Sequence, residues 1–82
     1  MPSDLEEQLA RAEVLIDEGD RRIRRQRDII VELEGRGSDA ALAEQVLGSF
    51  EDVQRVQLAK REQLLSQWHR SVQRKSSPAL HP

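Results

Sequence analysis

Residues 5–33 read LEEQLARAEVLIDEGDRRIRRQRDIIVEL. Mostly apolar residues recur along this stretch at steps of four and three, without a break. That alternation is an a/d heptad repeat, the pattern of an α-helix that packs lengthwise on another helix. We therefore expect a long helix with one seam, which must lie along a second helix. The seam positions are Leu5, Leu9, Ala12, Ile16, Gly19, Ile23, Gln26, Ile30 and Leu33.

The start of this helix carries a capping signal. Ser3 and Glu6 have the spacing of a capping box, in which the serine hydroxyl accepts from the N3 amide. We predict a cap segment at residues 1–3 and a first helix from about residue 4 to about residue 34, roughly 45 Å long at about 1.5 Å per residue. Gly19 falls on the seam, where a glycine leaves room for a large residue on the facing helix.

The strongest helix breaker in the chain is GRGSD at residues 35–39. A glycine just past a periodic segment usually ends a helix, and Ser38 or Asp39 can cap the next one. The short connection predicts a second, antiparallel helix over about 40–73. The expected fold is therefore all-α, a helical hairpin or antiparallel coiled coil over residues 4–74. Residues 75–82 carry two prolines and no periodicity, so we expect a disordered tail.

The register of the hairpin follows from the position of the turn. If the turn is centred near residues 36 and 37, the numbers of facing residues add up to about 73, and Gly19 lies opposite Val53 and Gln54. The charges support this register, because the acidic half of each helix then faces the basic half of the other; such pairing favours one orientation more than it adds stability. The expected interface residues of the seam are Leu5, Leu9, Ile16, Ile23, Ile30, Leu33, Val46, Phe50, Leu64 and Trp68.

Further apolar side chains lie beside the seam, where one partner helix does not cover them. Leu15 and Ile29 hold g positions, which widens the apolar stripe toward that of a bundle helix. Each such side chain left in water forgoes about 1.5–3 kcal/mol relative to full burial. We expect a homo-oligomer, most simply a two-fold dimer that forms a four-helix bundle; a different protein covering the same stripe is the alternative. The possible dimer face is Leu15, Ile29, Leu42, Leu65 and Val72.

Four polar residues fall at or near the seam. They are either water-facing positions of a lightly packed helix pair, or they set the register or the oligomeric state, as a buried polar a-position does. The second interpretation is favoured, because a polar residue in a seam costs stability. The four residues are Gln26, Gln54, Gln57 and Arg61.

Trp68 lies near the end of the second helix, next to His69. We expect its indole to close the open end of the hairpin against Leu5 and Leu9. The alternative is an anchor for a partner protein, since tryptophan is enriched at binding hot spots.

A run of arginines lies in the middle of the first helix. One interpretation is a helix that contacts the phosphates of nucleic acid or of a membrane surface. The favoured one is a solvated face, because Asp17, Glu18 and Asp20 stand four residues before an arginine, in the order that suits i,i+4 ion pairs. No aromatic residue interleaves the run, which removes a stacking mode. The possible phosphate contacts are Arg21, Arg22, Arg24, Arg25 and Arg27.

Composition excludes several classes of protein. Charged residues make up 34% of the chain but the net charge is only −2, which argues against a generic polyanion binder. Cysteine is absent and two histidines are too few for a metal cage, so we expect no metal and no cofactor. No nucleophile–base pair or Gly-rich phosphate loop occurs, so we expect no enzyme. Without an apolar run of about 18 residues or a secretory signal, we expect a cytoplasmic protein with no membrane partner.

The segments RAE at 11–13, EGDRRI at 18–23 and RQRDIIVELE at 25–34, with Gly37, Asp39 and the stretch 43–50, resemble a group of short, uncharacterised proteins common in soil proteobacteria. The similarity covers roughly residues 9 to 65. It implies a helical hairpin and a bacterial cytoplasmic origin, with no assigned activity and no catalytic or binding residues. We therefore expect a small structural or regulatory interaction module; the alternative is a nucleic-acid-binding protein that uses the arginine run.

Overall fold

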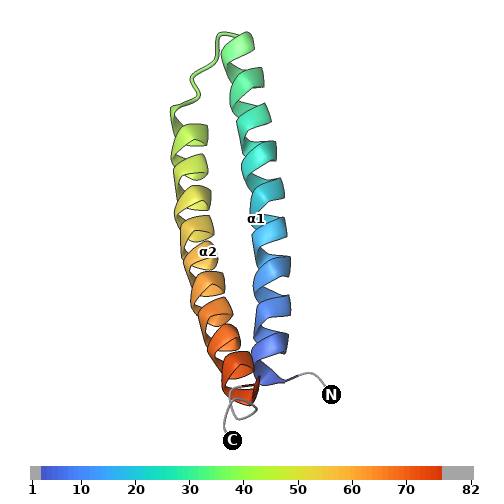
Figure 1. The fold of residues 1–82 in the computed structure, drawn as a ribbon. Coiled ribbons are helices and arrows are strands. Elements are labelled where there is room, and N and C mark those ends of the chain that lie inside the picture. The colour runs from blue at the N-terminus through green and yellow to red at the C-terminus, as the bar shows by residue number, and fades with distance from the viewer. Residues whose placement is uncertain (1–2, 77–82) are drawn as a thin grey trace, which may run out of the picture.

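The computed structural model describes residues 3–76, and only the backbone of residues 75 and 76. Two helices, α1 (Asp4–Gly35) and α2 (Ala41–Ser76), lie antiparallel and side by side (Figure 1), which confirms the all-α hairpin. Relative to the expected bounds, α1 ends one residue later, α2 begins one residue later, and α2 continues three residues further. Residues 1–2 of the expected cap segment and residues 77–82 of the expected tail lie outside the described residues.

The N-terminal end of α1 is capped by Ser3. Its backbone is extended and its side-chain oxygen accepts a hydrogen bond from the Glu6 amide at 3.1 Å. That contact is the serine half of the predicted capping box, and it satisfies one of the amides left free at a helix start. Asp4, Glu6 and Glu7 place negative charge at the positive end of the helix dipole. Local sequence alone therefore accounts for where α1 begins.

The turn is closed by a Schellman motif centred on Gly37. The Ser38 amide donates to the Leu33 carbonyl at 2.8 Å, and the Gly37 amide donates to the Glu34 carbonyl at 3.0 Å. The motif needs a left-handed residue at the position of Gly37, whose φ is +71° and which only glycine adopts at little cost. Asp39 then accepts from the Ala41 amide at 2.9 Å and starts α2, so of the two possible caps Asp39 makes the contact.

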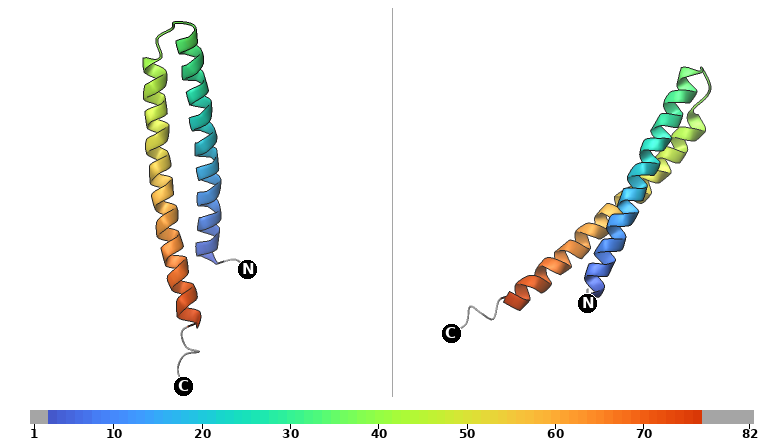
Figure 2. Two further views of the ribbon diagram at one scale, coloured as in Figure 1. Left: turned by 45° about the horizontal axis from the view of Figure 1, so that its top comes forward. Right: turned by 90° about the vertical axis from the view of Figure 1, so that its right-hand side faces the viewer.

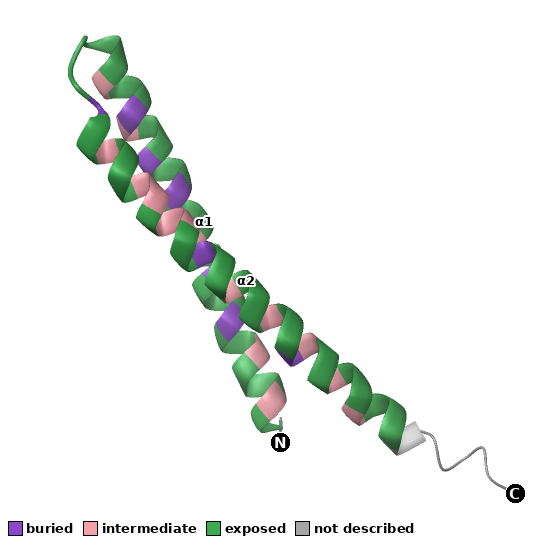
Figure 3. Ribbon diagram, turned by 90° about the vertical axis from the view of Figure 1, so that its left-hand side faces the viewer, coloured by how far each residue is buried: buried purple, intermediate pink, exposed green. Residues whose placement is uncertain are grey.

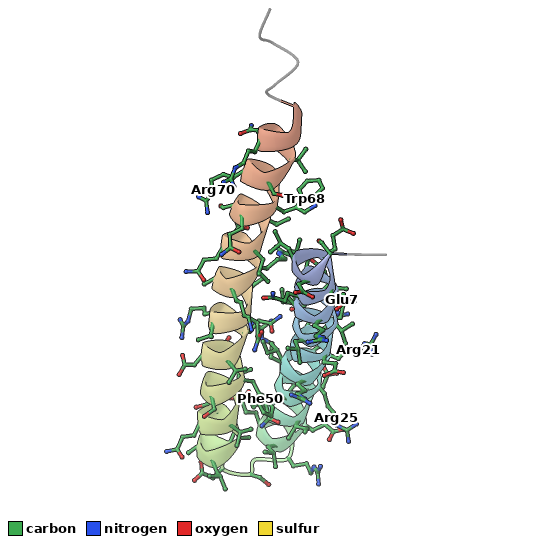
Figure 4. The ribbon with its side chains drawn as sticks, turned by 90° about the horizontal axis from the view of Figure 1, so that it is seen from below. Glu7, Arg21, Arg25, Phe50, Trp68 and Arg70 are labelled. Carbon is green, nitrogen blue, oxygen red and sulfur yellow. The ribbon has the colours of Figure 1, made fainter. Side chains whose placement is uncertain are left out.

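Burial follows one stripe along each helix (Figure 3). In α2 the least exposed residues recur at steps of three and four, as in α1, so both helices present a heptad seam. Gly19 lies against Gln54, and the numbers of these two residues add up to 73 as predicted. Phe50 also points toward α1 (Figure 4). The seam of α2 is Ala40, Ala43, Leu47, Phe50, Gln54, Gln57, Arg61, Leu64, Trp68 and Ser71.

Two features of α2 differ from the sequence-based picture. Val46 was expected in the seam, but its side chain is 36% exposed. The step from Ala43 is four, so Leu47 takes the seam position and Val46 holds the g position beside it. At the other end α2 extends beyond the start of α1, and the two helices diverge toward that end (Figure 2). The last turn of α2 therefore has no stretch of α1 opposite it.

Candidate interaction surface

The centre of the seam is a polar contact built around Gln54. Its amide nitrogen donates to the Ile16 carbonyl and to the Asp20 carboxylate, both at 2.9 Å. Gly19 makes the contact possible, because a Cβ at that position would come within 2.7 Å of the Gln54 Cδ atom. The large residue that Gly19 was expected to accommodate is therefore Gln54, whose side chain is buried.

A second glutamine makes the reciprocal contact nearer the turn. Gln26, buried on α1, donates through its amide nitrogen to the Ala43 carbonyl at 2.9 Å. Each helix thus places one glutamine on a backbone carbonyl of the other. The interpretation of the seam's polar residues as water-facing is wrong for Gln26 and Gln54. Both contacts specify one carbonyl, so they favour one register, which is the favoured role for these residues.

The polar residues of the seam cost stability. Three buried polar atoms between residues 3 and 76 have no hydrogen-bond partner: Gln54 Oε1, Gln57 Oε1 and Arg61 Nε. A buried group without a partner costs about 1–3 kcal/mol. The middle third of the α2 seam therefore adds little net stability, and packing on either side of it must hold the hairpin together.

Two ion pairs join the helices along one edge. Arg27 meets Glu51 at 3.2 Å, and Arg61 meets Glu13 at 3.4 Å. Both pairs join an acidic stretch of one helix to a basic stretch of the other, as the charge pattern predicted. Most of these side chains are well exposed, so each pair contributes at most about 1 kcal/mol.

The arginine run forms a collar on α1, comprising Arg21, Arg22, Arg24, Arg25 and Arg27. Its members occupy five different heptad positions, so they spread over the whole face of α1 that does not pack on α2 instead of lining one track. Arg21 and Arg25 point away from α2 (Figure 4). All five are exposed, and among the described residues only Arg27 makes an ion pair.

The expected i,i+4 ion pairs of the collar are therefore wrong. No ion pair joins Asp17, Glu18 or Asp20 to the arginine four residues later in the described part of the chain. Asp20 instead accepts from Gln54 across the hairpin. An exposed i,i+4 pair is worth only a few tenths of a kcal/mol, about 0.2–0.5, which a hydrogen bond at the seam exceeds.

The hairpin has two broad sides, defined by the heptad positions next to the seam. In an antiparallel pair the g positions of both helices line one side and the e positions line the other. Leu15, Gln57 and Lys60 line a shallow groove of about 130 Å³ on the g side, whereas the Arg27–Glu51 pair joins two e positions. We call these the g side and the e side.

The two sides carry opposite charge. The charged residues at g positions are all basic: Arg22, Lys60 and Arg74. At e positions six acidic residues stand with one arginine. The c positions flank the g side and the b positions flank the e side, and including them leaves six basic and three acidic residues on the g side against three basic and eight acidic residues on the e side. The acidic e-position residues are Glu6, Glu13, Asp20, Glu34, Glu44 and Glu51.

Exposed apolar side chains lie on both sides. The expected dimer face is not one surface, because Leu15, Ile29 and Leu42 belong to the g side and Leu65 and Val72 to the e side. Ile29 and Leu65 are half-buried and the other three exposed. The sequence analysis assigned Val46 to the seam and did not consider Val53 for this face, although both are exposed at g positions of α2. The heptad frame of α2, continued through its polar middle, is the signal that assigns them.

Trp68 lies near the free end of α2 (Figure 4), half-buried, with its ring 5.3 Å from that of His69. Leu5 and Leu9, at the start of α1, are also half-buried. The packing of the indole on these leucines stays a prediction, as does its role as a partner anchor.

Two further findings concern the described residues 3–76. No group of three or more acidic, histidine or cysteine side chains is placed to hold a metal ion. Neither α1 nor α2 is both long and apolar enough to cross a membrane.

Comparison of the chain with protein-family models, with curated proteins and with solved structures found no match. The resemblance to bacterial helical hairpins therefore stays a prediction.

Proposed function

We propose that this chain is a small non-enzymatic interaction module, structural or regulatory, that self-associates through helix–helix contacts. Its simplest assembly is two hairpins in a four-helix bundle. One observation carries the proposal: nine large hydrophobic side chains of the described helices are at least 36% exposed, against six buried hydrophobic residues. A cytoplasmic place in a bacterial cell is part of the proposal and rests on the resemblance.

The energetic argument is one of size. Two helices bury only one stripe each, and part of that stripe is polar here. A folded domain is stable by about 5–15 kcal/mol, and chains this short lie at the low end. Covering several aliphatic side chains at about 1.5–3 kcal/mol each for full burial would add an amount comparable to the whole stability of the hairpin. A second copy is the partner that is always present at equal concentration.

Sedimentation equilibrium of the full chain at tens of micromolar tests the proposal. We expect a mass above that of the 9.4 kDa chain, rising with concentration. A mass that stays at the monomer value, together with a cooperative melt independent of concentration, would contradict it and would favour a different protein as the partner.

Nucleic-acid binding through the collar is the second candidate, favoured by one observation. Arg21, Arg22, Arg24 and Arg25 are exposed and make no ion pair within the described residues. Against it, the collar spreads over the whole face of α1 that does not pack on α2, and acidic residues lie within one turn on both sides. Titration with duplex DNA at two salt concentrations tests this candidate, because phosphate contacts must weaken steeply with salt. Binding that is salt-sensitive and lost in Arg22→Gln/Arg25→Gln would support it.

A further inference from the structure

We infer that self-association joins unlike sides: the g side of one copy docks on the e side of a second copy. This inference rests on the proposed function and specifies its contact surfaces. It differs from the two-fold pairing expected from the sequence, in which the same surface of both copies would meet.

Charge selects this arrangement. Two g sides brought together would bring two sets of basic g-position residues into one interface, with no acidic residue at any g position of the described helices. Two e sides would bring together two sets of six acidic residues. A g side against an e side instead sets a predominantly basic surface against a predominantly acidic one. Like charges that meet at an interface oppose binding, and opposite charges fix its register.

The apolar side chains match in the same arrangement. On the g side Val46 and Val53 of α2 are seven residues apart and exposed. On the e side Leu58 and Leu65 of α2 have the same spacing. Equal heptad spacing lets the ridge of one helix fill the groove of another along its length. Each docked pair would therefore bury aliphatic side chains between rows of opposite charge.

The arrangement has a consequence for assembly size. A contact between unlike surfaces leaves one g side and one e side free in every pair of copies. A third copy can add by the same contact unless the geometry closes a ring. We therefore expect the average mass to pass beyond two chains as the concentration rises, and to fall as salt screens the charges.

Two charge-reversal variants of the full chain test the inference. Counting the flanking c and b positions, Arg22→Glu/Lys60→Glu leaves four basic and five acidic residues on the g side, and Asp17→Lys/Glu62→Lys leaves five basic and six acidic residues on the e side. None of these four residues makes an ion pair within the described hairpin, so the fold should be retained, which a circular-dichroism melt checks. The matched control is Arg21→Glu/Asp28→Lys, whose f positions face away from both sides.

At low salt we expect each variant alone to self-associate about tenfold more weakly than the natural chain, because the difference in charge between its two sides is then halved. An equimolar mixture of the two should recover the affinity, since each supplies what the other lacks. The control should behave like the natural chain. Sedimentation equilibrium measures the two variants, their mixture and the control against the natural chain.

Two results would overturn the inference. The first is undiminished self-association of Asp17→Lys/Glu62→Lys, because pairing between two g sides would not involve those residues. The second is a mixture that associates no better than its components. In either case the natural chain still self-associates and the proposed function stands. A natural chain that is monomeric throughout contradicts the proposed function itself, so the two failures are distinguishable.

Discussion

Gln54 shows what a polar residue in the seam can contribute to the fold. A leucine there would remove the unpartnered Oε1 atom and bury more apolar surface, but it would pack equally well in neighbouring registers. The amide instead contacts one carbonyl, that of Ile16, and one carboxylate, that of Asp20. Only a residue without a side chain at position 19 leaves space for it. The pair Gly19 and Gln54 therefore exchanges some stability for a defined register.

Substitution of Gly19 should show this coupling. Gly19→Ala gains up to about 1 kcal/mol of helix propensity. It also displaces the Gln54 amide and its two hydrogen bonds, at about 1 kcal/mol each. We expect a net loss of stability in the natural chain but a net gain in a Gln54→Ala background, where the space is empty. Urea unfolding of the four chains of this double-mutant cycle measures the difference. Equal effects in both backgrounds would show that the two residues are not coupled.

At the scale of the element, the two ends of the hairpin are built differently. The turn end is closed by hydrogen bonds of the Schellman motif and by small residues, with Ala40 buried and Ala43 half-buried, which let the helices approach closely. At the open end the seam positions carry larger side chains, such as Leu9 and Leu64, and α2 continues past α1 (Figure 2). A short turn has little conformational freedom. Its geometry therefore sets how α2 aligns with α1, including the polar contacts of the seam.

The two glycines near the turn should respond in opposite ways. Gly37→Ala forces a Cβ into the left-handed region at φ +71°, which costs about 1–2 kcal/mol. Gly35→Ala is the matched control: Gly35 is the last residue of α1, and nothing lies within 4 Å of where its Cβ would be. We expect the control to be neutral or more stable by up to about 1 kcal/mol. Thermal unfolding compares them, and a loss in Gly35→Ala that equals the loss in Gly37→Ala would be inconsistent with the Schellman account.

Features that follow from a repeat or from the turn could be predicted from the sequence. Features that depend on a choice between two contacts of similar energy could not. The alternating steps of four and three predicted the first helix, the short connection predicted the second, and the position of the turn predicted that Gly19 lies opposite Val53 and Gln54. The acceptor of Gln54 was not predictable, because Asp20 could equally pair with Arg24 and the energies differ by less than about 1 kcal/mol. Val46 and Leu47 were also ambiguous, since both are aliphatic and only the frame set by Ala43 separates them.

At the scale of the whole molecule, the hairpin is a thin rod with almost no interior. Every residue is within one helix diameter of solvent, so burial can grow only by adding another layer of helices. The two sides next to the seam are where such a layer would pack. Their composition of aliphatic and charged residues in alternation is typical of bundle helices that are half covered.

Leu15 should be one of the positions where that layer matters. It holds a g position and its side chain is 45% exposed, whereas its neighbour Val14 is 56% exposed at an outward f position. Leu15→Ser loses a few tenths of a kcal/mol of helix propensity and Val14→Ser almost none, so within one hairpin their costs should differ only slightly. Only Leu15→Ser removes surface that the proposed contact buries. We expect it to weaken self-association about tenfold, the equivalent of about 1.4 kcal/mol.

Thermal melts over a range of concentrations measure this, because the midpoint of an associating chain rises with concentration. In Leu15→Ser that rise should shift to higher concentration, and in Val14→Ser it should stay in place. Identical concentration dependence in both variants would mean that the g side is not the surface that self-association covers.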